Sequence, residues 1–152
     1  RYLMGVGSPE DLIQCIGRGI DLFDCALPTR VARNGGLFTR EGRVRIKHAR
    51  FHGLDGPLEA GCDCFTCKTF SAAYLQHLFR SGELLYHRLA TIHNLRFIVR
   101  LLEKAREAIL KGTFAVFAEE VLFVYRASNE ETRMEQKDKW LVARLARASG
   151  ID

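Results

Sequence analysis

The segment Cys62-Asp63-Cys64-Phe65-Thr66-Cys67 places three cysteines within one short turn of the chain, and His93 follows after twenty-five intervening residues. Zinc in proteins prefers thiolate sulfur and imidazole nitrogen, and four such ligands close a tetrahedral structural site. The spacing therefore predicts one structural Zn²⁺, with the fourth ligand brought back by a helical hairpin. The expected ligands are Cys62, Cys64, Cys67 and His93.

A set of buried or redox-active thiols is the alternative interpretation of the three cysteines. A disulfide between Cys62 and Cys64 is disfavoured, because both side chains leave the same tight turn. The chain holds five cysteines, an odd number with three of them clustered. This pattern favours a metal and a reducing compartment over a secreted disulfide framework, and we predict a cytoplasmic protein.

The composition limits the class of protein further. With 152 residues and 47% hydrophobic residues, the chain is long enough for one core of ordinary size. No apolar run approaches the roughly 20 residues that span a bilayer, so we expect no membrane association. Residues 30–50 hold seven basic side chains and the single acid Glu41. This excess suits a polyphosphate partner such as RNA, and a solvated basic face is the alternative.

The chain opens with two apolar runs, residues 2–7 and 20–25, on either side of an expected helix. Ser8 is a suitable N-cap, Pro9 suits the first helical position, and acids follow in the first turn. The pattern predicts a β-α-β unit with parallel neighbouring strands. Two parallel strands cannot bury both of their faces, so we expect the chain to be the C-terminal part of a larger protein.

Asp24 lies at the expected carboxyl end of the second strand, where α/β barrels and open sheets carry their chemistry. Met4 and Gly5, at the end of the neighbouring strand, would face the same opening. Position alone is weak evidence, because aspartate is also common in turns and methionine usually fills cores.

Residues 35–47 have the pattern of a β-hairpin with its turn at Glu41-Gly42. Val44 and Ile46 would point to one face, and three cations to the other. Those cations, Arg43, Arg45 and Lys47, would contact an RNA backbone or keep an exposed strand soluble.

The second half of the sequence has helical periodicity. It predicts helices at residues 71–80 and 83–111, with His93 at the edge of the apolar stripe of the longer one. Phe114, Phe117, Val121, Leu122 and Tyr125 form a further stripe, which core packing explains by default and an interface explains alternatively. Residues 129–152 are charged and predict a marginal amphipathic helix or a frayed tail.

Four motifs carry a resemblance to a known family: residues 1–7, residues 23–30, residues 32–35, and the three cysteines with Thr91-Ile92-His93-Asn94. They resemble bacterial tRNA-guanine transglycosylases, also called queuine tRNA-ribosyltransferases, in the family's order over residues 1 to about 128. The resemblance implies an α/β fold, the C-terminal part of a (β/α)8 TIM barrel. The chain would keep the last two strands, a zinc-binding insertion and the closing α-helices.

The same resemblance implies a division into three parts. Residues 1–36 would end the barrel and carry the catalytic motif, residues 37–128 would form the zinc-binding subdomain and C-terminal helices, and residues 129–152 would be the charged tail. Family members work as homodimers, so a homodimer is the implied assembly.

The resemblance makes Asp24 the nucleophile. It would attack the ribose at the wobble position of a tRNA with a GUN anticodon, expel guanine and form a covalent ribosyl ester, which a 7-deazaguanine base then displaces. A carboxylate suits this two-step displacement, because the transition state has oxocarbenium character.

The remaining implied roles concern binding. Met4 would pack on the purine beside Gly5, Tyr2 would line the wall, and Arg30 and Arg33 would hold the anticodon loop. Whether queuine or its aminomethyl precursor enters depends on residues upstream, although the bacterial-type motifs favour the precursor. The general acid/base also lies upstream, so the isolated chain is predicted to be inactive.

Two other functions stay open at this point. One is a non-catalytic tRNA-binding or partner subunit of the same family, and the other is an unrelated zinc-stapled RNA-binding module. Asp24 argues against the first, because a subunit without catalysis would be free to lose that carboxylate. The β-α-β opening argues against the second.

Overall fold

The computed structural model describes residues 1–125. The chain opens with β1 (Tyr2–Met4), α1 (Pro9–Gly17) and β2 (Leu22–Asp24). The two strands pair in parallel, with Met4 opposite Asp24, which confirms the predicted β-α-β unit. Each strand is shorter than its apolar run. β1 stops where Gly5 adopts a φ of +77°, a conformation that ends extended pairing.

The predicted start of α1 is also confirmed. Ser8 Oγ accepts a hydrogen bond from the backbone N–H of Asp11, and Pro9 occupies the first turn. Leu12 and Ile13 lie on the buried face of the helix. The local sequence is therefore sufficient to explain where this helix begins and which side it buries.

A short helix and the predicted hairpin follow: α2 (Leu27–Arg33), β3 (Gly36–Thr39) and β4 (Gly42–Arg45). β3 is buried along its whole length, while Arg43 and Arg45 of β4 are exposed. Gly42, at φ +105°, completes the turn, and Thr39 Oγ1 donates to its carbonyl oxygen at 2.8 Å. The hairpin places its cations outward, as its alternating pattern predicts.

Helices make up the rest of the described chain. They are the 3-10 helix η1 (Ala49–Phe51), α3 (Phe65–Thr69), α4 (Ala72–Arg80) and the long α5 (Leu84–Leu110). Residues 114–125 are helical as well. The bounds of α4 and α5 agree with the predicted helices to within about one residue.

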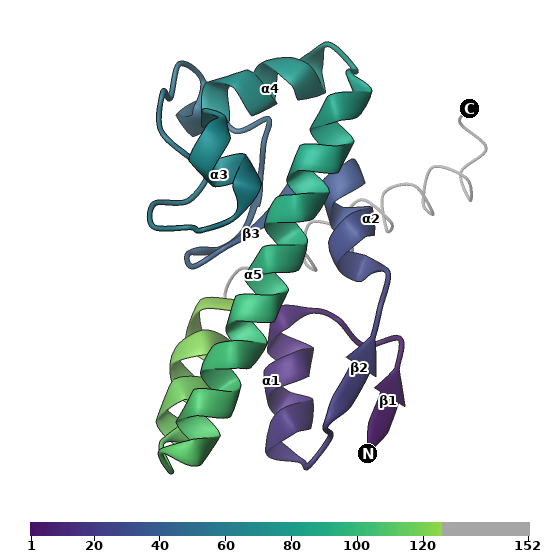
Figure 1. The fold of residues 1–152 in the computed structure, drawn as a ribbon, viewed down its shortest axis with the longest axis vertical. Coiled ribbons are helices and arrows are strands. Elements are labelled where there is room, and N and C mark those ends of the chain that lie inside the picture. Colours follow the sequence, from purple (N-terminus) through teal and green to yellow (C-terminus); the bar gives the residue numbers. More distant parts are fainter. Residues whose placement is uncertain (126–152) are drawn as a thin grey trace, which may run out of the picture.

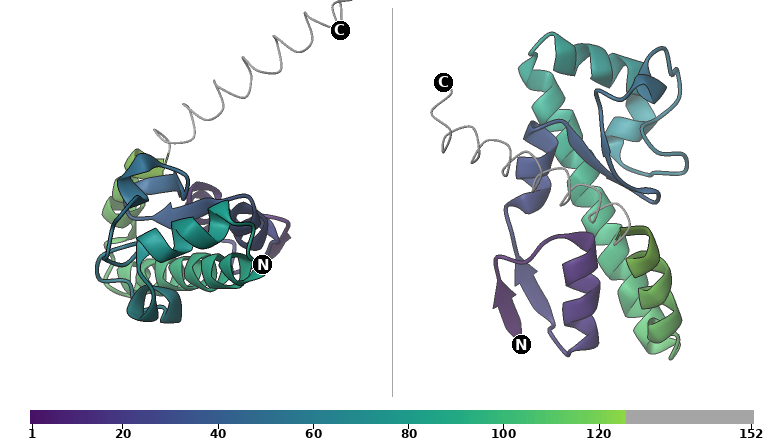
Figure 2. Two further views of the ribbon diagram at one scale, coloured as in Figure 1. Left: turned by 90° about the horizontal axis from the view of Figure 1, so that it is seen from above. Right: turned by 180° about the vertical axis from the view of Figure 1, so that it is seen from behind.

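The long helix α5 organises the molecule (Figure 1). It contacts α1, α2, α3, α4 and β3, and its buried face runs from Tyr86 to Ala108. The main core cluster lies around the hairpin, α4 and the first half of α5. Figure 2 shows the β-α-β unit near one end of α5 and the α3–α4 region at the other.

Residues 114–125 pack back on α5, and Phe114, Phe117, Val121, Leu122 and Tyr125 all join core clusters. The default interpretation of this stripe is confirmed. The helix predicted within residues 129–152 lies outside the described residues. Within residues 1–125, no helix combines the length and hydropathy that membrane crossing requires.

Candidate metal centre and strand-end carboxylate

The structure brings the four predicted metal ligands together. Their ligand atoms all lie within 4.8 Å of one another. The Nδ1 atom of His93 is 3.8 Å from Cys62 Sγ, 3.7 Å from Cys64 Sγ and 3.4 Å from Cys67 Sγ. Cys62, Cys64 and His93 are buried, and Cys67 is partly buried. We call these four residues the Cys3His cluster.

The cluster has the dimensions of a tetrahedral zinc site. Zinc bonds of about 2.3 Å to sulfur and 2.0–2.1 Å to nitrogen, at tetrahedral angles, separate sulfur from nitrogen by roughly 3.5 Å. The three measured separations fall on either side of this value. His93 Nε2 lies 2.8 Å from the carbonyl oxygen of Phe38, to which it donates, so Nδ1 faces the three sulfurs and would direct its lone pair toward them in the neutral imidazole that a metal binds. A backbone partner of this kind fixes the orientation of a ligating imidazole.

The crowding of the cluster shifts the pKa values of its side chains. Hydrogen bonds from the Cys64 and Cys67 thiols lower the pKa of Cys62 far below the usual range of a thiol. The pKa of Cys67 is raised, because its thiol hydrogen-bonds to Cys62 and Cys64. Burial is the largest single influence and lowers the pKa of His93. Hydrogen bonds to Cys62, Cys64 and the Phe38 carbonyl oxygen, together with the charge of Cys62, outweigh it and raise the pKa to about 10. A metal ion would replace these shared protons.

Two contacts that the sequence did not predict dock the cysteine segment on α5. Thr66, between the second and third cysteines, is fully buried, and its Oγ1 donates to the carbonyl oxygen of Leu89 at 2.7 Å. Asp63 accepts three hydrogen bonds from the Arg96 guanidinium, at 3.0, 3.1 and 2.7 Å, which hold the pKa of Asp63 below its usual value. Both partners lie within one turn of His93.

A third missed residue, Asn94, follows His93 directly. It is fully buried and accepts a hydrogen bond from the backbone N–H of Phe38 at 3.0 Å. Its amide nitrogen donates to the carbonyl oxygens of Pro28 and Gly36, both at 3.1 Å. The Thr-Ile-His-Asn motif contained this residue, but nothing in the sequence showed which backbone groups it would bind.

Asp24 is exposed at the carboxyl end of β2. The Tyr2 hydroxyl donates to Asp24 Oδ1 at 2.6 Å, and this hydrogen bond raises the pKa of Tyr2. Met4 stands opposite Asp24 with 69% of its surface exposed, and the N–H of Gly5 donates to the Asp24 carbonyl oxygen at 2.9 Å. The structure therefore brings the predicted nucleophile and the predicted base-binding residues to one exposed strand end.

The predicted RNA-binding cations lie on two elements. Arg30 and Arg33 are exposed on α2, away from the face that buries Pro28 and Val31. Arg45 and Lys47 are exposed on the hairpin, where the Lys47 ammonium lies 5.4 Å from the centre of the Phe79 ring. Arg43 lies beside Gly36, and partial burial followed by the charge of Arg45 lowers its pKa.

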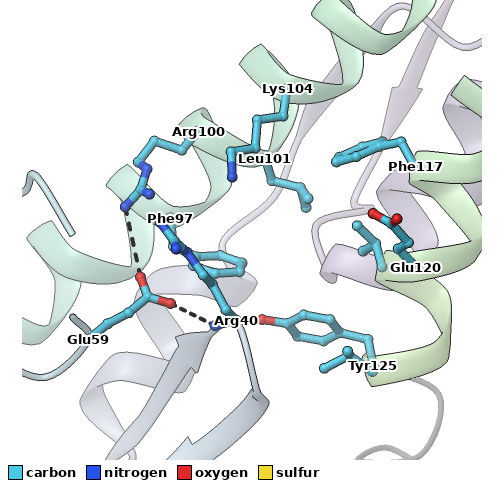
Figure 3. Close-up of a pocket in the computed structure, with 11 residues that line it drawn as sticks. Arg40, Glu59, Phe97, Arg100, Leu101, Lys104, Phe117, Glu120 and Tyr125 are labelled. Carbon is cyan, nitrogen blue, oxygen red and sulfur yellow. Dashed lines mark hydrogen bonds and ion pairs between the residues drawn. The ribbon is translucent and has the colours of Figure 1, made fainter. Parts of the chain in front are cut away.

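A cavity of about 260 Å³ lies between α5 and residues 114–125 (Figure 3). Its wall includes the apolar side chains Phe97, Leu101 and Phe117, and its rim includes the Glu59 carboxylate. Glu59 accepts a hydrogen bond from the backbone N–H of Arg40 at 2.6 Å and pairs with Arg100 at 3.8 Å. The lining contains neither Asp24 nor any residue of the Cys3His cluster.

Comparison with known proteins places the chain in a family. The family model described as queuine tRNA-ribosyltransferase matches residues 1–127. A queuine tRNA-ribosyltransferase of Dehalococcoides mccartyi is 52% identical over 149 residues, which cover 98% of this chain and 38% of the relative. Relatives of the same name from Herpetosiphon aurantiacus and Helicobacter hepaticus are 58% and 54% identical, over 80% and 77% of this chain and 31% of each relative.

The match therefore extends over nearly all of the described chain, while the chain spans less than two fifths of the curated relatives' length. The described structure is a mixture of helices and small sheets with a Cys3His cluster that has the donors and the spacing of a metal site. The family model and the relatives all carry the name queuine tRNA-ribosyltransferase. The chain belongs to the queuine tRNA-ribosyltransferase family.

Proposed function

We propose that this chain is the part of a tRNA-guanine transglycosylase that carries the nucleophile and a surface for the anticodon loop. The observation that carries the proposal is the exposed Asp24 carboxylate, hydrogen-bonded by Tyr2 and paired across the strands with Met4. In the intact enzyme β1 and β2 would be the last strands of a (β/α)8 barrel. Barrel enzymes carry their chemistry at this end of the strands.

The chemistry assigned to Asp24 is a double displacement. Its carboxylate attacks the ribose anomeric carbon of the wobble nucleotide in a GUN anticodon, and guanine leaves with the bonding electrons. A 7-deazaguanine base then displaces the aspartyl ester, so configuration is retained after two inversions. The hydrogen bond from Tyr2 orients the carboxylate, and the exposed Met4 is free to pack on the purine beside Gly5.

The RNA would lie over the exposed cations. Arg30 and Arg33 hold the anticodon loop, and Arg43, Arg45 and Lys47 add backbone contacts. These contacts position the RNA, while the base pocket reads the sequence. In this proposal the incoming base is the aminomethyl precursor of queuine, the location is the cytoplasm and the assembly is a homodimer.

The metal assigned to the Cys3His cluster is a structural zinc ion. Three thiolates and the Nδ1 atom of His93 fill a tetrahedral shell, which leaves no position for a reacting water. Bound zinc would cross-link the cysteine segment to α5, whose His93 is also hydrogen-bonded to β3. The residues around it hold the ligands in place through Thr66, Asp63 and the Phe38 carbonyl oxygen.

The test is guanine exchange by the full-length protein that contains this chain. Radiolabelled guanine entering a tRNA with a GUN anticodon is measured for the wild type, for Asp24→Asn and for Asp55→Asn, a control at an exposed loop carboxylate. Loss of the nucleophile should lower the rate by at least about a thousandfold, whereas the control should exchange at the wild-type rate. Substantial exchange by Asp24→Asn would contradict the proposal.

A further inference from the structure

The buried amide of Asn94 connects two elements that carry different parts of the proposed site. It uses its oxygen for the N–H of Phe38 in β3 and its nitrogen for the carbonyl oxygens of Pro28 in α2 and Gly36 in β3. Its side chain is 0% exposed. Both amide donors are therefore used on backbone groups, and burial makes each of these hydrogen bonds costly to lose.

The preceding residue completes the contact with β3. His93 Nε2 donates to the carbonyl oxygen of Phe38, so residues 93 and 94 occupy both backbone polar groups of Phe38. The Phe38 ring also packs against Phe97, one turn further along α5. The strand is thus held against α5 at the position where α5 supplies a ligand to the Cys3His cluster.

The helix α2 depends on this contact more than a longer helix would. It has seven residues, and its N-cap residue, Ala26, makes no side-chain capping bond. A helix of this length is not stable by itself, so packing must hold it in place. Pro28, Val31 and Ala32 form its buried face, which leaves Arg30 and Arg33 exposed on the other side.

Asp24 has a separate anchor although it lies only four residues before Pro28. The N–H of Gly5 donates to its carbonyl oxygen at 2.9 Å, and the Tyr2 hydroxyl donates to its carboxylate at 2.6 Å. Both groups belong to the β1 side of the parallel pair. The nucleophile and the α2 arginines are therefore neighbours in sequence that are fixed by different parts of the molecule.

We propose that Asn94 is a positioning residue that sets α2, and with it Arg30 and Arg33, relative to the β3–β4 hairpin, while β1 positions Asp24 independently. The roles of Arg30, Arg33 and Asp24 rest on the proposed function. If Asn94 positions only the RNA-holding arginines, its loss should weaken tRNA binding and raise the KM for tRNA. Loss of folded enzyme would instead lower kcat and leave KM unchanged.

The experiment compares Asn94→Ala with Gln76→Ala in the full-length zinc-loaded protein. Gln76 is the matched control, because it is 3% exposed and its amide also donates to two backbone carbonyl oxygens, those of Ile46 and His48, at 2.9 and 3.0 Å. It lies on α4, and its two bonds end on residues 46 and 48, just after β4, and not on α2. Zinc content, amide hydrogen exchange without RNA, and kcat and KM for tRNA are measured.

Asn94→Ala should retain zinc and raise the KM for tRNA by about tenfold, with kcat within about threefold of wild type. Amides of residues 29–33 should exchange about tenfold faster. Gln76→Ala should leave residues 29–33 as protected as in the wild type and accelerate only residues near 46–48; because Lys47 lies there, KM should rise by no more than about twofold. Unchanged protection of residues 29–33, a fall in kcat at constant KM, or equal effects of Gln76→Ala would each overturn the proposal.

If Asn94→Ala loses its metal or its fold, Asn94→Asp replaces it with the same expected and contrary results. That variant keeps an oxygen facing the Phe38 N–H and removes the donors to Pro28 and Gly36. Amide hydrogen exchange can be measured without enzymatic activity, so the proposed function and the role of Asn94 can fail separately. A wild-type protein without base exchange would refute the proposed function, while the protection of residues 29–33 would still decide the role of Asn94.

Discussion

At the scale of single residues, the cluster depends on side chains that bind backbone groups of distant elements. His93 binds Phe38, Asn94 binds Pro28 and Gly36, and Thr66 binds Leu89. Each of these side chains is 0% exposed, so each hydrogen bond is made where water cannot replace it. The metal ligands were predictable from their spacing, because cysteine and histidine have few other reasons to cluster. The backbone partners of His93, Asn94 and Thr66 were not predictable, because tertiary packing decides which backbone groups these side chains meet.

Replacing Thr66 by valine tests this view of the cysteine segment. Valine has nearly the same shape but cannot donate to the Leu89 carbonyl oxygen, so the free energy of unfolding should fall by about 1–2 kcal/mol. The same change at Thr69, exposed at the end of α3, should have an effect below about 0.5 kcal/mol. Urea unfolding of the two variants gives both values, and equal stabilities would show that the Thr66 hydrogen bond does not hold the segment.

At the scale of elements, α5 receives the other parts of the fold along one buried face. Local signals were enough to predict its extent, the capped start of α1, the bounds of α4 and the hairpin, since these depend on residues close in sequence. The lengths of β1 and β2 were not predictable from hydrophobicity. Val6 continues the apolar run after Gly5, but the positive φ of Gly5 has already ended the pairing.

The exposed face of the hairpin leads to a prediction about salt. If Arg43, Arg45 and Lys47 each neutralise a phosphate, replacing all three by alanine should reduce the slope of log affinity for tRNA against log salt by about 2–3. Fluorescence anisotropy with the full-length protein at several salt concentrations measures this slope. The matched control removes Lys104, Arg106 and Lys111, three exposed cations of the same total charge in and just after α5. Equal slopes for both triple variants would contradict a role of the hairpin in RNA binding.

At the scale of the whole molecule, the two-stranded β1–β2 sheet lies at the edge of the described structure, with Tyr2, Met4 and Leu22 exposed. The chain spans 38% of the Dehalococcoides relative. A barrel that continues this sheet remains a prediction, as do the boundary at residue 36 and the homodimer. Sequence could supply them only through resemblance, because within residues 1–125 β1 pairs with β2 alone.

The isolated chain is accordingly predicted to show no guanine exchange, since the general acid/base and most of the base pocket are assigned to other strands. Incubation with labelled guanine and tRNA measures this directly, with the full-length protein as the positive control. Exchange by the 152-residue chain above the rate without enzyme would show that the chain holds a complete site.

Metal removal should loosen the fold around α3. We expect one zinc per chain, and a chelator should lower the Tm by more than about 10 °C, because binding free energy at such sites is folding free energy. Acidification should also lower the Tm, since protons compete with the metal for the thiolates and the imidazole. Cys67→Ser should lose the metal, and Cys15→Ser, in α1 outside the cluster, should keep it. Full metal content in Cys67→Ser would contradict the assigned ligand set.

The central claim is that Asp24 bonds to the wobble ribose, and trapping that bond tests it most directly. The full-length protein is incubated with a GUN-anticodon tRNA, denatured and run on a gel, and the RNA-linked peptide is identified by mass spectrometry. We predict a covalent protein–RNA band whose cross-link maps to Asp24. The band should disappear in Asp24→Asn, while that variant keeps the zinc content of the wild type. A band that persists in Asp24→Asn, or that maps to another carboxylate, would contradict the account.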